Sequence, residues 1–163
     1  MNVLAIGAHP DDVEIACSGT LAKCVKRGDK VIVCHASTGN LGHVVIPPDE
    51  LTKIRAEEAK KAGGLAGIEV IGGMFDDLNI FDGNKAARDK LVDVIKYAQP
   101  DFIITHNPDD YMPDHTAVSR LVFDASFAAT LPNYKSRYEK AAALVPIYYM
   151  DTLAGVDFQP TKY

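Results

Sequence analysis

An apolar run at the start of the chain leads directly into a cluster of side chains of the metal-ligand type. Residues Asn2–Ala8 are apolar at almost every position, which is typical of a strand that is buried on both faces of a parallel sheet. The sequence His-Pro-Asp-Asp follows at positions 9–12 without an intervening loop. Because ligands bind at the carboxyl ends of the strands in open parallel sheets, this order predicts a polar site at the end of a central strand.

Amphipathic helices alternate with apolar strands along the rest of the chain. Helices are predicted around Cys17–Val25, Leu51–Ala62, Ala87–Ala98 and Val118–Ala125, and further strands at Lys30–Ala36, Ile68–Ile71, Asp101–Thr105 and Ala143–Met150. Gly28, the Gly63-Gly64 pair and Pro100 are expected to end the first three helices. The last dozen residues carry no clear element. We expect one domain over residues 1–163 with an α/β fold, a Rossmann-like three-layer sandwich with a mainly parallel sheet.

A second group of acidic and histidine residues follows the strand predicted at Asp101–Thr105. Residues 106–115 read His-Asn-Pro-Asp-Asp-Tyr-Met-Pro-Asp-His, so the two loops together hold several carboxylates, which resist ionisation side by side unless a cation neutralises them. Two imidazoles and one carboxylate around an open position form a catalytic zinc arrangement, and iron(II) accepts the same donors. If the first and fourth strands are neighbours, a metal is predicted at their carboxyl ends, held by His9, Asp12 and His115.

Structural roles compete with this interpretation at several positions. Either aspartate of positions 11 and 12, taken alone, is also a helix N-cap residue. Pro113 suits the first turn of a helix, which would place the neighbouring Asp114 and His115 near the predicted crevice. His35 is expected to be structural. His106 is expected to support the ligands or a loop rather than to bind the metal, and the sequence leaves the role of His43 undetermined.

Two charged residues on an apolar helix side give another signal. Arg55 and Glu58 share the side of the second predicted helix that carries Leu51, Ile54 and Ala62. A charge on such a side is rarely buried without a partner. Arg55 and Glu58 are therefore either an ion pair at the boundary of the core, or Arg55 reaches the crevice to hold an oxygen-rich substrate or to orient Glu58.

Composition and missing motifs argue against several other classes of protein. The net charge of -5 disfavours nucleic acid or an anionic membrane surface as the main partner, and no apolar run approaches the ~20 residues of a membrane span. Three cysteines without a CxxC pair are expected to be buried free thiols, and with no apparent signal peptide they suggest a reducing cytoplasm.

No GxGxxG follows the first strand, which disfavours a dinucleotide site. A receiver-like signalling domain would need an acidic residue directly after the third strand, where Gly72 stands instead.

The motifs resemble those of the PIG-L family, which is also called LmbE-like. Its members are zinc-dependent N-acetylglucosamine deacetylases. The similarity covers at least residues 3–127 and is carried by AHPDD at positions 8–12, TGN at 38–40, R-x-x-E-A at 55–59 and PDH at 113–115. It implies removal of an acetyl group from an N-acetylglucosamine-type amide, with Asp11 as general base and zinc as the metal. The residues implied to contact the substrate are Arg55, Met112 and Asn40, and those that support the site from behind are Asp114, His106 and Glu58.

The chain departs from the family pattern at Met112, where family members usually have the first histidine of HPDH. That histidine normally stabilises the oxyanion or protonates the leaving amine, and Asp114 is expected to orient it. The alternative function is therefore a metal- and sugar-binding relative with little or no turnover. Family members usually continue for several tens of residues, so part of the substrate wall is expected to lie outside this sequence. They are often homo-oligomers, and the resemblance implies the same here.

Overall fold

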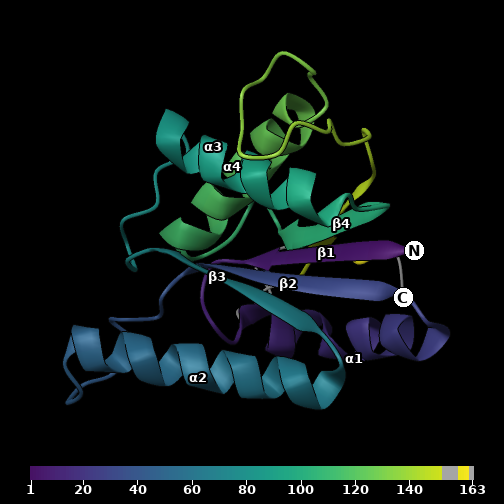
Figure 1. The fold of residues 1–163 in the computed structure, drawn as a ribbon. Coiled ribbons are helices and arrows are strands. Elements are labelled where there is room, and N and C mark those ends of the chain that lie inside the picture. The colour runs from purple at the N-terminus through teal and green to yellow at the C-terminus, as the bar shows by residue number, and fades with distance from the viewer. Residues whose placement is uncertain (152–157, 162–163) are drawn as a thin grey trace.

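One parallel sheet with helices on both faces organises the chain (Figure 1). The computed structural model describes residues 1–151 and 158–161. The strands are β1 (Asn2–Gly7), β2 (Lys30–Ser37), β3 (Glu69–Phe75), β4 (Phe102–His106) and β5 (Ile147–Met150), and the helices are α1 (Asp12–Arg27), α2 (Pro48–Ala66), α3 (Lys85–Ala98) and α4 (Pro113–Ala128). The strand order is β3-β2-β1-β4-β5, with α1 and α2 on one face and α3 and α4 on the other. The predicted α/β sandwich is confirmed.

Strand β1 lies in the middle of the sheet and is buried on both faces. It pairs in parallel with β2 and with β4. Its side chains alternate between two cores: Leu4 and Ile6 pack with α3 and α4, whereas Val3 and Ala5 pack with residues of α1. The strand order reverses at β1, so the carboxyl ends of β1 and β4 lie side by side. The predicted neighbourhood of the first and fourth strands is therefore confirmed.

The sequence predicted that helix α2 ends at the Gly63-Gly64 pair. This is wrong, because the helix continues to Ala66. It ends at Gly67, whose φ of 68° is in the left-handed region that glycine adopts without strain. Gly63 has a packing role instead: a Cβ atom there would lie 2.4 Å from Cγ2 of Val70 in β3. Gly63 thus allows the helix to approach the sheet closely, and a glycine in the sequence does not by itself distinguish this role from a helix end.

Two strand limits also differ from the prediction. Strand β3 continues past Ile71 to Phe75, with a register shift against β2. Strand β5 begins at Ile147, opposite Ile103, and is shorter than predicted: its bonding to β4 starts where the N–H of Ile103 donates to the carbonyl of Pro146. Most of the last dozen residues, for which no element was predicted, lie outside the described residues.

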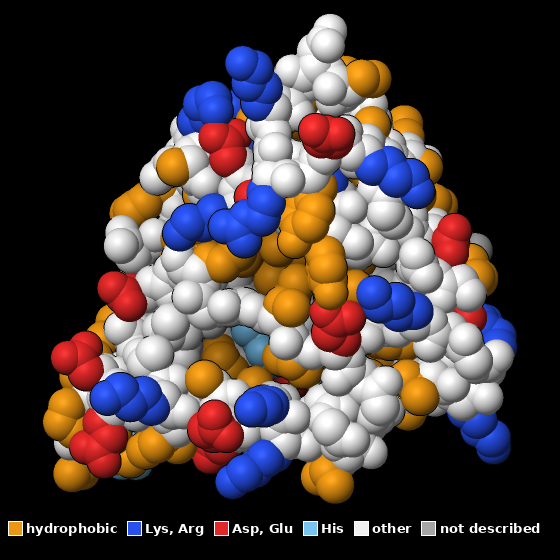
Figure 2. Space-filling view, in the orientation of Figure 1, with side chains coloured by type: hydrophobic (Ala, Val, Ile, Leu, Met, Phe, Trp, Pro, Cys, Tyr) orange, Lys and Arg blue, Asp and Glu red, His pale blue; other side chains and the backbone are white. Residues whose placement is uncertain are grey.

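Charged side chains of both signs are mixed on the surface of the molecule (Figure 2). Figure 2 shows Lys and Arg side chains interspersed with Asp and Glu over the face that it draws, without a continuous positive area. None of the helices described here combines the length and the hydropathy of a membrane-crossing segment.

The three cysteines are buried free thiols, which gives a test of the fold. Burial raises the pKa of Cys34 and of Cys17 to about 12, so almost no thiolate is available for reaction at pH 8. We expect Ellman's reagent to leave both thiols unmodified in the native protein and to modify all three cysteines in denaturant. Rapid native labelling of Cys34 would contradict the described packing of β2.

Candidate functional site

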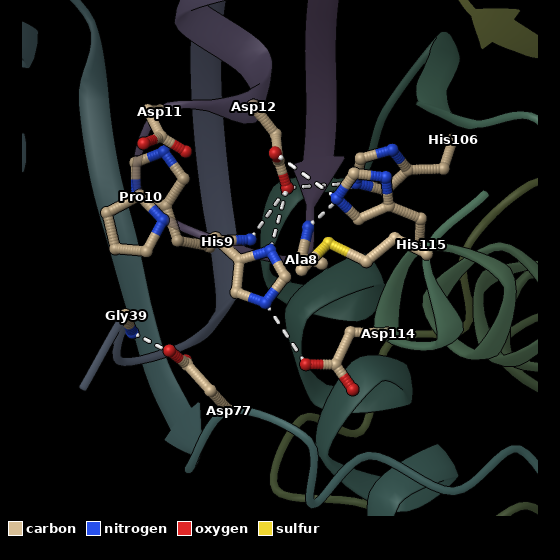
Figure 3. Close-up of polar contacts among 12 residues, drawn as sticks. Ala8, His9, Pro10, Asp11, Asp12, Gly39, Asp77, His106, Asp114 and His115 are labelled. Atoms are coloured by element: carbon tan, nitrogen blue, oxygen red, sulfur yellow. Dashed lines mark hydrogen bonds and ion pairs between the residues drawn. The ribbon is translucent and has the colours of Figure 1, made fainter. Parts of the chain in front are cut away.

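The carboxylate of Asp12 lies at the centre of the candidate site, in the first turn of α1, and three imidazoles surround it (Figure 3). Nδ1 of His9 lies 3.5 Å from Oδ2 of Asp12, and Nε2 of His106 lies 3.1 Å from the same oxygen. Nε2 of His115 lies 3.3 Å from Oδ1. His9 follows β1, His106 ends β4, and His115 lies in the first turn of α4. The two loops singled out in the sequence therefore do meet at one point.

Two further carboxylates orient the imidazoles of His9 and His115. Oδ2 of Asp114 lies 3.0 Å from Nε2 of His9, and Oδ1 of Asp110 lies 3.1 Å from Nδ1 of His115. In each ring one nitrogen faces an outer carboxylate and the other faces Asp12. This is the carboxylate–histidine arrangement that commonly fixes the ring orientation and tautomer of metal ligands.

The contacts of Asp114 correct one expectation from the sequence. Its Oδ2 also accepts a hydrogen bond from the backbone N–H of Leu78, at 2.7 Å. Because the carboxylate is engaged by His9 and Leu78, it is not the unpartnered group that the replacement of a histidine by Met112 was expected to leave.

The donor set fits a divalent metal ion. One ligand atom from each of His9, Asp12 and His115 lies within 4.8 Å of the others. Both ring nitrogens of His115 are buried and have no hydrogen-bond partner among the described residues, although Nε2 is close to Asp12 and Nδ1 is close to Asp110. A buried nitrogen of this kind is costly unless something binds it. His106, Asp110 and His115 form a second group within the same distance, and it too holds buried polar atoms without a hydrogen-bond partner, but it does not line the cavity that opens onto the site, as the first group does.

The charges of the site favour a cation. Burial favours the neutral form of Asp12, but the three imidazoles outweigh it and hold the pKa of this carboxyl well below its usual range. Burial also opposes protonation of His9, yet Asp12 and Asp114 raise its pKa to about 9. The pKa of His115 is raised by Asp12 and Asp110 in the same way. The pKa of His106 is lowered by burial, and its Nε2 accepts a hydrogen bond from the backbone N–H of Ala8.

Asp11 lies beside this cluster and is held by Arg55. Nη2 of Arg55 lies 2.8 Å from Oδ2 of Asp11 and also donates to the carbonyl of Pro10, while Nη1 lies 3.5 Å from Glu58. Arg55 is thus ion-paired, as one interpretation expected, and it lines the cavity; its contact with a substrate stays a prediction. Burial raises the pKa of Asp11 against the opposing charge of Arg55.

Two residues at the site have a strained backbone. Asp11 has a φ of 147° and Leu78 a φ of 59°, in the region that favours glycine. Such conformations persist only where the surroundings impose them, and they cluster at functional sites. Here they direct the carboxylate of Asp11 toward Arg55 and the N–H of Leu78 toward Asp114.

A cavity of about 630 Å³ opens onto the cluster. The three candidate ligands line it, together with Asp11, Arg55, Glu58, Met112, Tyr111 and His43. Asn40, which was expected to contact the substrate, is not part of this wall. Its Oδ1 accepts from the N–H of Asp77, and its Nδ2 donates to Asp76. Both polar atoms of the Asn40 side chain are thus used to join two loops, and its contact with a substrate stays a prediction.

Sequence reasoning missed the contacts of two carboxylates. Asp77 follows β3 and accepts hydrogen bonds from the N–H groups of Gly39 and Leu41, each at 2.9 Å. Asp110 was counted only as one charge of a cluster, although its side chain is fully buried against His115. Both residues follow strands whose carboxyl ends lie at the same edge of the sheet. This position was the feature of the sequence that could have placed them near the site.

The orienting carboxylates lead to a prediction about metal affinity. Asp114→Asn and Asp110→Asn each remove a charge that holds a candidate ligand ring, and we expect each to weaken metal binding by about 10–100-fold. Asp109→Asn, at an exposed neighbouring position, is the matched control and should leave the affinity unchanged. Titration with zinc against a competing chelator measures the effect, and equal affinities in all three variants would contradict it.

Comparisons with known proteins agree with this geometry. The chain is 26% identical over 154 residues to a 4-oxalmesaconate hydratase of Pseudomonas putida, covering 90% of this chain and 59% of that protein. It is 31% identical over 140 residues to a 1D-myo-inositol 2-acetamido-2-deoxy-alpha-D-glucopyranoside deacetylase of Corynebacterium diphtheriae, covering 69% of this chain and 47% of that protein. The chain thus spans only about half to three fifths of these relatives.

A solved structure and a family model extend the match. The conserved protein TT1542 of Thermus thermophilus superposes with a TM-score of 0.84 at 25% identity, over 98% of this chain and 69% of that one. The family model described as PIG-L, GlcNAc-PI de-N-acetylase, matches residues 4–126, which include every candidate ligand. With the fold, the cluster around Asp12 and this match in agreement, the chain belongs to the PIG-L family.

Proposed function

We propose that this chain is a metal-dependent N-deacetylase that hydrolyses the acetyl amide of an N-acetylated amino sugar. The observation that carries the proposal is the position of Asp11, beside the His9, Asp12 and His115 group and outside it. A hydrolytic metal site needs such a group, because a base must accept the proton of the attacking water. We further propose zinc as the metal, with iron(II) as the other ion that suits the same donors.

The residues of the site have two kinds of role, metal binding and proton transfer. A divalent metal held by His9, Asp12 and His115 supplies Lewis-acid activation of water and of the acetyl carbonyl. Asp11 accepts the proton as the water oxygen bonds to the carbonyl carbon. The C–N bond then breaks, the proton passes to the amine, and the products are acetate and the free amino sugar. Arg55 keeps Oδ2 of Asp11 in place.

The charge of the cavity supports a sugar rather than a polyanion as substrate. Four carboxylates line it, those of Asp11, Asp12, Glu58 and Asp77, and Arg55 is its single Lys or Arg side chain among the described residues. Since Arg55 is already paired with Asp11, no free guanidinium or ammonium group offers itself to a substrate carboxylate. This disfavours transferring to this chain the activity of the hydratase relative, whose name specifies a carboxylate substrate. A neutral N-acetyl sugar meets no such repulsion.

The role of Asp11 gives the first test. Asp11→Asn keeps the size of the side chain and removes its basicity, so we expect kcat for acetate release from N-acetylglucosamine compounds to fall by about 10²–10⁴-fold. The bound metal should stay near one equivalent. His115→Ala is the contrasting variant, because it removes a proposed ligand and should lose most of the metal. Loss of metal from Asp11→Asn instead would reverse the assigned roles of the two adjacent aspartates.

Met112 gives a second test, because a thioether offers neither a strong hydrogen-bond donor nor a proton. Removing one oxyanion donor from a working site costs about 10²–10³ in kcat, so the wild type is expected to be slow. Met112→His should raise kcat, but by less than that factor, since Asp114 is engaged by His9 and cannot orient the new ring. Met112→Leu is the matched control and should change nothing. If neither Met112→His nor the wild type releases acetate although both hold metal, the binding-only alternative replaces the proposal.

A further inference from the structure

His43 lies in the loop between β2 and α2 and is a residue whose role the sequence left undetermined. Its Nδ1 accepts hydrogen bonds from two backbone N–H groups of the same loop, those of Val45 at 3.1 Å and Ile46 at 2.9 Å. A backbone N–H can only donate, so Nδ1 must be the acceptor and the ring hydrogen is on Nε2. The loop therefore fixes the tautomer of His43 and presents an Nε2–H donor.

The Nε2–H donor of His43 belongs to the cavity in which the sugar is proposed to bind. His43 lines the same cavity as the candidate metal ligands, and no described residue is bonded to its Nε2. The donors of His9, His115 and Arg55 are directed at carboxylates. Among the described side chains of the cavity wall that are neither candidate metal ligands nor ion-paired, the hydroxyl of Tyr111 and Nε2–H of His43 are the two unengaged donors.

The cavity needs such donors because about half of its other polar side chains can only accept. Its four carboxylates suit the hydroxyl hydrogens of a saccharide but not its oxygens. Tyr111 precedes α4 and packs edge-on against His115, so it belongs to the metal side of the cavity. His43 comes from the loop before α2, just after the part of that loop that Asp77 holds at Gly39 and Leu41. Its own ring accepts two hydrogen bonds from the loop, and a donor on a ring held in this way loses less freedom when it binds a ligand.

We propose that His43 binds the amino-sugar substrate, by donating a hydrogen bond from Nε2–H to one of the sugar's hydroxyl or glycosidic oxygens. This inference rests on the proposed function, since it assigns a substrate contact within the same cavity. The competing role is purely structural, in which the imidazole only closes the loop over its own Nδ1.

Two substitutions separate these roles. His43→Asn retains an acceptor, the carboxamide oxygen, for the N–H groups of Val45 and Ile46, but it loses the distal donor of the ring. His43→Ala loses both functions. Val44→Ala is the matched control, because this neighbouring side chain is 98% exposed and does not line the cavity.

We expect His43→Asn and His43→Ala to raise KM for a methyl N-acetylglucosaminide by about two- to tenfold, the value of one neutral hydrogen bond, with kcat little changed. Val44→Ala should match the wild type. If His43→Asn matches the wild type while His43→Ala alone is impaired and has a lower Tm, the role is structural and the proposal is overturned.

A direct binding measurement keeps this test separate from the test of deacetylation. Two-bond ¹H–¹⁵N correlations of the zinc-loaded protein should show the Nε2–H tautomer of His43 and a shift of Nε2 on titration with the methyl N-acetylglucosaminide. A sugar that binds without turnover, and binds more weakly to His43→Asn, would refute the proposed function and support the role of His43. Absence of both binding and turnover would refute both, and an Nδ1–H tautomer would refute the role of His43 alone.

Discussion

The parallel pairing of β1 with both β2 and β4 is the constraint on which the candidate site depends. Both faces of β1 are buried, so polar side chains can follow it only where the sheet ends. At that edge α1 leaves toward one face, while the loop after β4 leads into α4 on the other. The first polar residues after the two strands must therefore share the space between diverging helices.

Within that space, charge dictates the arrangement of the side chains. Three carboxylates, those of Asp12, Asp110 and Asp114, alternate with the three imidazoles of His9, His106 and His115. So much negative charge in a partly buried site requires a cation. The same carboxylates raise the pKa values of His9 and His115, so the site attracts positive charge. A divalent ion between these rings and Asp12 would supply that charge.

The sequence predicted the parts of the structure that depend on local pattern and on general topology. The strands, their parallel order and the meeting of the loops at 9–12 and 106–115 follow from apolar periodicity and from the rule on strand ends. The contacts of Asp110 and Asp114 could not be predicted, because they depend on how the first turn of α4 is oriented. The placement of Asn40 depends on a hydrogen bond between two loops that are distant in sequence. Gly63 was misread because close packing and helix termination use the same residue type.

The carboxylate of Asp77 divides the loop between β2 and α2 into two parts with different freedom to change. Its bonds fix the first part, at Gly39 and Leu41, and the adjoining residue Leu78 is bonded to the carboxylate that orients His9. A substitution in this part would disturb the metal ligands and the loop together. Residues 43–46 carry no such connection, and Val44 is almost fully exposed. New substrate preferences could therefore arise in this second part while the chemistry of the ligands stays intact.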